Sequence, residues 1–370
     1  MSNFSAARAA MSQSKVPRYS AAELNRVLDA HEGFVRGDRG GQRAIWRFGQ
    51  APGGDFSGRQ LANADFTGAN LKGARLVRTN FERACLQLAD LREVDAEQAS
   101  FMRADIRGVS LRGANLAGAN FDEADLRQAV LAQGGSEDFR LIDRPGPAAG
   151  SATDITFEVD FTQCSMRAVR LAKARLCRAN FSGAYMAGAE LTGADLRGAR
   201  FRGAILTGAK LAGAMIDPQA LATCVVDPTQ RALDRAGLLI ERLQASALWA
   251  ASDGVEGGAA ELDGEDLRPL GEAFVGRRLP AISARRSCGV DMNFVGAQLQ
   301  GARFDDADLR GADFSRADLR GACFRGANLR FARFGDADIR ALPLASGGAC
   351  PVDLTGADFA AQCFAASVRD

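Results

Sequence analysis

The stretch "RFDDADLRGADFSRADLRGACFRGANLRF", residues 303–331, places a Leu or Phe at every fifth residue. An α-helix turns about 500° in five residues, so no helical face would stay apolar. In a flat strand, an odd spacing would send successive large side chains to opposite faces. The chain must therefore turn a corner once per five-residue repeat. The central positions are Phe304, Leu309, Phe314, Leu319, Phe324 and Leu329.

Three blocks of sequence carry this period, with central positions spanning 56–131, 161–216 and 294–339. A second period of twenty residues lies on the first, so four repeats should make one coil with four walls. In the third block Phe and Leu alternate, which predicts Phe on two opposite walls. We therefore expect ladders of stacked Phe rings inside the coils. In the second block the ladder would contain Phe161, Phe181 and Phe201.

The other positions of the repeat are consistent with a narrow core. The residue two places before each central Leu or Phe is usually Ala, which points inward without overfilling the lumen. Polar residues such as Asp65, Asn70 and Arg112 are expected outside. Gly at the last place of many repeats, as at Gly68 and Gly193, suits a corner. Successive coils would then pair at about 4.8 Å.

These repeats resemble the pentapeptide repeat family, whose pattern is A-(D/N)-L-x-x. The match is clear in "ANADFTGANLKGARL" (62–76), in "AGAELTGADLRGARF" (187–201) and in the opening stretch. The resemblance covers more than half of the chain. It implies an all-β solenoid that is a right-handed quadrilateral β-helix, with the hand given by the resemblance alone.

The repeats and their interruptions divide the chain into four segments. Inside the second segment, the Gly-, Pro- and Ser-rich stretch 132–155 reads either as an ejected loop or as an irregular coil. Both alternatives keep the Phe ladder in phase, and we expect one continuous stack through this point. The segments are a tail with a capping helix (1–50), a β-helix (51–226), a helix with an acidic, Gly-rich linker (227–270) and a second β-helix (271–370).

A helix is predicted before the first repeats, in "SAAELNRVLDAHEGFV" (20–35). Ser20 and Glu23 form a capping-box pattern at its start. Such a helix can close the end of a β-helix, whose first coil would otherwise expose unpaired edges. Its apolar stripe consists of Leu24, Val27, Leu28 and Phe34.

A second helix is predicted in "DPTQRALDRAGLLIERLQASALWAAS" (227–252), with Asp227 as N-cap and Pro228 in the first turn. The acidic stretch 253–269 after it indicates a linker. The last block then starts imperfectly near Phe274. Leu233, Ala236, Ile240, Leu243 and Ala247 form the stripe of this helix. The register of the last block recurs at Leu344, Leu354, Phe359 and Phe364.

The residues needed for catalysis are scarce. His31 is the single histidine, which excludes a His-based triad or a multi-His metal site within one chain. No phosphate-binding loop or nucleophile motif is present, so we expect no catalytic residue, no cofactor, no metal site and no enzyme. The eight cysteines lack C-x-x-C spacing, and no long apolar run suggests a signal peptide or a transmembrane segment. We expect a cytoplasmic protein.

Charge is the strongest local signal. The second block carries nine Lys or Arg and two acids, whereas the first carries ten of each and the third seven of each. A basic patch of this kind could hold an acidic protein surface, a nucleic-acid backbone or an anionic membrane face. A solvated Arg-rich face is the alternative. The patch residues fall on two adjacent walls and their shared corner, at Arg175, Arg178, Arg197, Arg200 and Arg202.

Three functions compete at this point. The first is a non-enzymatic scaffold with an unidentified protein partner, since repeat rods present extended surfaces. The second comes from the resemblance, because some pentapeptide repeat proteins mimic DNA and bind DNA gyrase; that mimicry needs a continuous acidic surface, which the positive second block opposes. The third is polyanion binding through the basic patch. A homodimer through an uncapped end or the Leu-rich internal helix is a further expectation.

Overall fold

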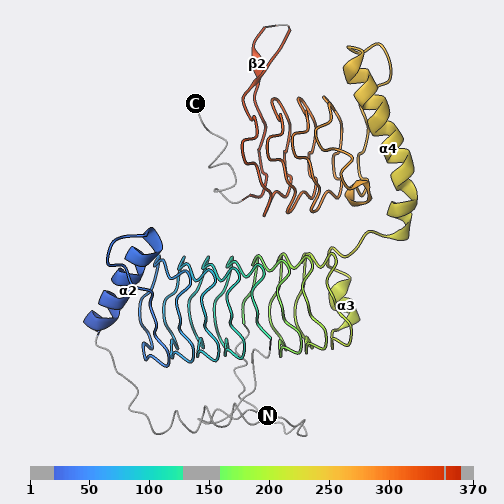
Figure 1. Ribbon diagram of the computed structural model, residues 1–370. Helices are drawn as coiled ribbons and strands as arrows, with labels where there is room; N and C mark the ends of the chain where they lie inside the picture. The colour runs from blue at the N-terminus through green and yellow to red at the C-terminus, as the bar shows by residue number, and fades with distance from the viewer. Residues whose placement is uncertain (1–20, 128–158, 346, 360–370) are drawn as a thin grey trace. The chain divides into compact units, whose positions relative to one another are not determined.

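The computed structural model describes residues 21–127, 159–345 and 347–359. The chain divides into two compact units, the first ending at Asp227 and the second beginning at Pro228. Each unit is a stack of coils, which we call the first and the second solenoid (Figure 1). The repeat solenoid expected from the sequence is therefore confirmed.

Parallel backbone bridges join residues that are twenty apart, from Ile45 with Asp65 to Ile205 with Val225. Each bridging residue comes just before a central residue, usually Leu or Phe. The N–H of that central residue continues the pairing; Phe66 N, for example, donates to the carbonyl oxygen of Cys85 at 2.7 Å. Since twenty residues are four repeats, each coil has four walls. Because a corner follows every repeat, each wall contributes only a short bridge and not a strand of several residues.

The corners lie two residues after the central position and have φ near +60°. Gly68 and Gly193 both take φ 66, as expected. Leu88 and Arg178 adopt the same conformation, with φ 58 and φ 59, although it is uncommon for residues with a Cβ. The coil geometry thus overrides the local preference of these side chains.

Stacked Phe rings fill the core, as the sequence predicts. The rings of Phe161 and Phe181, and those of Phe181 and Phe201, have centroids 5.0 Å apart and lie nearly parallel. In the second solenoid, Phe304 stacks on Phe324 at 5.3 Å and meets the ring of Phe314, from the opposite wall, edge-on at 5.9 Å. Two facing Phe ladders therefore share this lumen.

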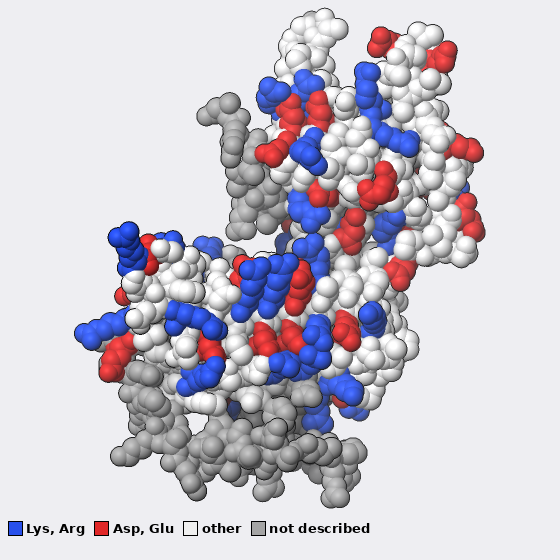
Figure 2. Space-filling view, viewed as in Figure 1, with Lys and Arg blue, Asp and Glu red and all other residues white. Residues whose placement is uncertain are grey.

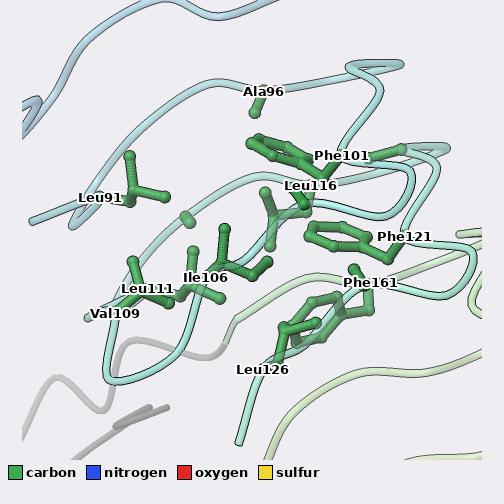
Figure 3. Close-up of a cluster of buried hydrophobic side chains, with 14 of the residues drawn as sticks. Leu91, Ala96, Phe101, Ile106, Val109, Leu111, Leu116, Phe121, Leu126 and Phe161 are labelled. Atoms are coloured by element: carbon green, nitrogen blue, oxygen red, sulfur yellow. The ribbon is translucent and has the colours of Figure 1, made fainter. Parts of the chain in front are cut away.

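The coils on either side of the long insertion pair directly. Asn120 bridges Ser165, and Asp125 bridges Arg170, so paired residues are 45 apart here. One continuous stack is confirmed, but the prediction that the ladder stays in phase is wrong. An insertion of any multiple of five residues keeps the same side chains pointing inward. The 25 extra residues here, which are five more than a full coil, move each ladder to the neighbouring wall. The rings of Phe121 and Phe161 consequently meet edge-on, at 5.8 Å (Figure 3). The stretch 132–155 itself lies outside the described residues.

A buried carboxylate joins the coils across this insertion. Asp122 accepts hydrogen bonds from Ser165 Oγ (2.6 Å) and from the backbone N–H of Arg167 (2.9 Å), and Arg167 Nη2 completes an ion pair at 2.9 Å. Asp263 makes the same contacts to Ser283 and Arg285 in the second solenoid. There, too, the spacing departs from twenty, since Glu261 bridges Ser283.

Helix α2 (Ala21–Arg36) packs at the first coil of the first solenoid (Figure 1). Leu28 and His31 are fully buried, and Ala44 N donates to His31 Nδ1 at 2.9 Å. Phe34, expected in the apolar stripe, is exposed and stacks against the His31 ring instead. Ser20 of the predicted capping box lies outside the described residues.

The other end of the first solenoid carries the short helix α3 (Pro218–Leu221). Asp227, predicted to cap the following helix, instead accepts a hydrogen bond from Gly208 N at 2.7 Å. This carboxylate therefore bonds a backbone N–H of the first solenoid and does not cap the following helix. Helix α4 (Gln230–Ala251) begins later, with Thr229 as its N-cap.

Helix α4 packs on the second solenoid through Leu239 and Leu243, whereas Leu233 of the predicted stripe is exposed. The prediction of a linker over 253–269 is wrong for its last part. Leu262 and Leu267 are buried, and Asp266 bridges Cys288, so these residues form the first coil. The 3₁₀ helix η1 (Arg268–Leu270) follows in this coil.

The second solenoid ends with a hairpin and one further paired segment. Strands β1 (Leu342–Pro343) and β2 (Ala349–Cys350) form the hairpin, and Asp353 then bridges Cys323, thirty residues earlier. Leu354 and Phe359 pack against the core, as their register predicts, but Leu344 is exposed in the hairpin. Phe364 lies outside the described residues.

Candidate functional site

Many outward charges are neutralised by an ion pair inside a single repeat. In the pattern A-D-L-R-G, the Asp before the central residue and the Arg after it lie side by side. Asp125 accepts from the backbone N–H of Arg127 at 3.1 Å and forms an ion pair with its guanidinium at 2.7 Å. The same pair recurs at Asp90–Arg92, Asp105–Arg107, Asp195–Arg197, Asp266–Arg268, Asp308–Arg310, Asp318–Arg320 and Asp338–Arg340. Figure 2 shows blue and red side chains interleaved on the visible face.

Several described repeats lack the Asp before an Arg, among them those of Arg112 and Arg330, and one repeat places a second cation there. In "ARFRG", residues 199–203, Arg200 replaces the Asp, so Arg202 has no carboxylate in its own repeat. The coil below offers Asn180 and Ser182, which are neutral and hydrogen-bonded to each other at 2.7 Å. Among the described coils, this is the one repeat with a cation at both outward positions. Positive charge is therefore concentrated on this wall.

The neighbouring wall adds further arginines. Arg175 bridges Asp195 in the next coil, and Arg197 is 69% exposed while paired with Asp195 at 2.7 Å. Arg178 lies at the corner between the two walls, with its stem against Gly198. We call this surface the basic corner; its residues are Arg175, Arg178, Arg197, Arg200 and Arg202.

The structure shows that the charge count overstates the positive charge that the second block exposes. Arg167 pairs with Asp122, and Arg170 lies 3.3 Å from Asp125, so acids of the first block neutralise part of the second. The hydrogen bond from Arg197 also holds the pKa of Asp195 below its ordinary value, despite partial burial. Within the described residues, the guanidiniums without an ion pair at the basic corner are those of Arg175, Arg178 and Arg202.

Sequence reasoning missed an apolar feature beside the basic corner. A shallow, open depression of about 300 Å³ adjoins Arg197. Met215 occupies the outward position held by Arg175 and Asp195 in the two coils before it, and it is 47% exposed. The sequence did contain a signal for this feature, because Met215 is apolar at a position that is charged in the two preceding coils. The lining consists of Arg197, Gly198, Met215, Ile216, Asp217 and Pro218.

The described part of the chain contains no group of three or more His, Cys, Asp or Glu side chains placed to hold a metal ion. Burial lowers the pKa of His31 and raises that of the Cys164 thiol. No helix within the described ranges is long and apolar enough to cross a bilayer.

The family model described as pentapeptide repeats matches eight copies, at residues 60–98, 99–133, 157–193, 184–217 and 293–330. The chain is a pentapeptide repeat protein. The family pattern has Asp or Asn before the central residue, so Arg200 is a departure from the pentapeptide repeat at the position that supplies the ion-pair partner. No curated protein matches the sequence.

Solved structures of other pentapeptide repeat proteins are similar to this one. HetL, involved in heterocyst differentiation regulation in the cyanobacterium Nostoc sp. strain PCC 7120, is 18% identical; the match covers 90% of this chain and 100% of HetL, with a TM-score of 0.36. QnrB1, a plasmid-mediated fluoroquinolone resistance protein, is 16% identical over 72% of this chain and 89% of its own, with a TM-score of 0.19. Rfr23 from the cyanobacterium Cyanothece 51142 is 18% identical over 50% and 84%, with a TM-score of 0.10.

Proposed function

We propose that this pentapeptide repeat protein is a non-enzymatic scaffold whose basic corner binds an acidic surface of a protein partner. The observation that carries the proposal is the repeat 199–203, where Arg200 takes the place of the Asp that neutralises Arg in other repeats. Arg202 therefore lacks a carboxylate in its own repeat, and Arg175 and Arg178 likewise have no ion pair with the described residues.

Carboxylates are suitable ligands for these guanidiniums. A guanidinium presents a planar fork of donors that matches a carboxylate in a bidentate geometry. The guanidiniums lie on a stack of hydrogen-bonded coils, so little backbone freedom is lost on binding. Their positive potential would also accelerate the encounter with an acidic partner at low salt.

Polyanion binding is the second candidate, because the same guanidiniums could contact phosphates. Base stacking lacks support, since Tyr185 is buried and lies under the Arg167 guanidinium, 5.7 Å from its ring centroid. A gyrase modulator would need a continuous acidic surface, and the basic corner does not favour it.

A pull-down with matched variants tests the proposal. The wild type and Arg286→Glu/Arg316→Glu, which changes two exposed corner arginines of the second solenoid, should retain the same stoichiometric partner. Arg178→Glu/Arg202→Glu carries the same charge change at the basic corner and should lose that partner. Equal retention by all three proteins would overturn the proposal. Nucleic acid that is lost steeply with added salt would support the polyanion alternative.

A further inference from the structure

We propose that the ligand of the basic corner is an acidic peptide segment that also places one aliphatic or aromatic side chain in the depression beside Met215. This inference rests on the proposed function and specifies the chemistry of the partner. The proposed site has two parts. Carboxylates of the ligand contact guanidiniums of the basic corner, and an apolar side chain of the ligand contacts the Met215 thioether.

The apolar half of the site lies at the end of one wall. Along that wall the outward ladder runs Arg175, Asp195 and Met215, so a charged surface gives way to an exposed Met in the last coil. Ile216 is only partly buried and contributes apolar surface to the same depression. A Met side chain adapts to differently shaped apolar groups, because it is unbranched and polarizable.

The polar groups around the depression set the direction of the ligand. Asp195 holds Arg197 through an ion pair, and Asp217 accepts from Gln219 N at 3.1 Å as the N-cap of α3. An acidic segment would be repelled by Asp217 and attracted by Arg178 and Arg202. Its carboxylates should therefore lie toward Arg178 and Arg202, with the apolar side chain toward Met215.

The spacing of the coils sets the spacing within the ligand. Arg178 and Met215 belong to coils two steps apart, which is about 10 Å along the solenoid axis. An extended peptide advances about 3.3 Å per residue, so about three residues should separate the apolar side chain from the acid on Arg178. A nucleic-acid backbone has no counterpart to the apolar group, which is why the observations favour a peptide.

Fluorescence anisotropy with the full chain tests this inference. The probes are a labelled peptide with a cluster of Glu and one Leu three residues away, the same peptide with Ser in place of Leu, and a single-stranded oligonucleotide. Met215→Gln should weaken binding of the Leu peptide about fivefold to tenfold and leave the Ser peptide unchanged. Met215→Leu should restore the affinity for the Leu peptide. Leu233→Gln, at an exposed Leu of α4, is the matched control and should change nothing.

The outcomes separate the inference from the proposed function. If Met215→Gln binds both peptides like the wild type, while Arg178→Glu/Arg202→Glu weakens both, the apolar subsite is refuted and the proposed function stands. If the Arg variant changes only oligonucleotide binding, both are refuted. Since Met215 is exposed, Met215→Gln should keep the thermal unfolding midpoint of the wild type. Recovery of peptide binding by Met215→Leu would show that the weaker binding of Met215→Gln is not caused by misfolding.

Discussion

Paired charges within one repeat define what each residue can contribute to binding. Arg197 and Arg202 hold equivalent positions in successive repeats, yet one has a carboxylate two residues before it and the other has Arg200. Exposed ion pairs contribute little to stability, about 0–1 kcal/mol, because solvent screens them. Their main effect here is to set how much positive charge the surface offers to a ligand.

Asp195→Asn should therefore increase binding while slightly lowering stability. The change releases Arg197 from its ion pair and keeps the size of the side chain. We expect the acidic Leu peptide to bind about twofold to fivefold more tightly at low salt, as one more guanidinium becomes available. Titrations at two salt concentrations measure this, with Asp338→Asn as a control in the second solenoid. Weaker binding by Asp195→Asn would contradict the assignment of Arg197 to the site.

At the scale of elements, α2 closes the first solenoid with a buried imidazole. His31 accepts the N–H of Ala44 through Nδ1, and burial, with a smaller effect from Arg43, lowers its pKa; Glu32 opposes this. A protonated ring could not accept that hydrogen bond. Because the folded-state pKa lies below the ordinary value of about 6.5, the stabilisation is complete above that pH and declines as the pH falls.

Acidification from pH 7.5 to 5.5 should thus weaken the packing of α2 selectively. Hydrogen exchange, corrected for the intrinsic pH dependence of the rate, should show lower protection at Ala44 and along α2 at pH 5.5. Helix α4 contains no histidine and provides the internal control. Equal protection of α2 at both pH values would show that His31 does not couple to its packing.

The carboxylates that join irregularly spaced coils form the second device at this scale. Asp122 is buried and makes charge-assisted bonds to Ser165 and Arg167 across the insertion. Removing its charge leaves these donors with a weaker acceptor. Asp122→Asn should lower the free energy of unfolding by about 1–3 kcal/mol. Asp90→Asn, at a more exposed pair in a regular coil, should lower it by less than about 1 kcal/mol. Similar losses in urea unfolding for the two variants would argue against a special role for Asp122.

At the scale of the whole molecule, two separate hydrophobic cores support two solenoids. Each coil contacts mainly its neighbours, so stability should depend on unbroken ladders rather than on a single centre. The two tryptophans report on different units, Trp46 on the first coil of one and Trp249 on α4 of the other.

Phe181→Ala should destabilise the first solenoid strongly. Its ring lies between those of Phe161 and Phe201, so removal forfeits contacts on both sides and leaves a cavity. We expect a loss of about 3–5 kcal/mol, seen in urea unfolding followed by the fluorescence of Trp46 in a Trp249→Phe background. Phe359→Ala, at a partly buried position in the second solenoid, should leave that transition unchanged. A small effect of Phe181→Ala would contradict the nearest-neighbour description.

Much of this molecule could be predicted from its sequence, because a five-residue period admits few geometries. The stacking of Phe161 on Phe181 followed from spacing alone. The phase across the insertion did not, since 20 and 25 extra residues preserve the same inward pattern. Leu262 and Leu267 were not recognised as core residues because the sequence around them is acidic and Gly-rich. The placement of the five arginines on two walls followed from the period, whereas the neutralisation of Arg167 depended on Asp122, 45 residues earlier.

The 45-residue offset between paired coils has a consequence for how such a chain can change. Inserting or deleting a whole repeat leaves the interior chemically identical but rotates everything downstream by a quarter turn. The 25 extra residues between the paired coils before and after the insertion have shifted the later ladders by one wall relative to the earlier ones. One more repeat there would aim the same arginines in a new direction without altering any of them, so surface orientation and surface composition can vary independently.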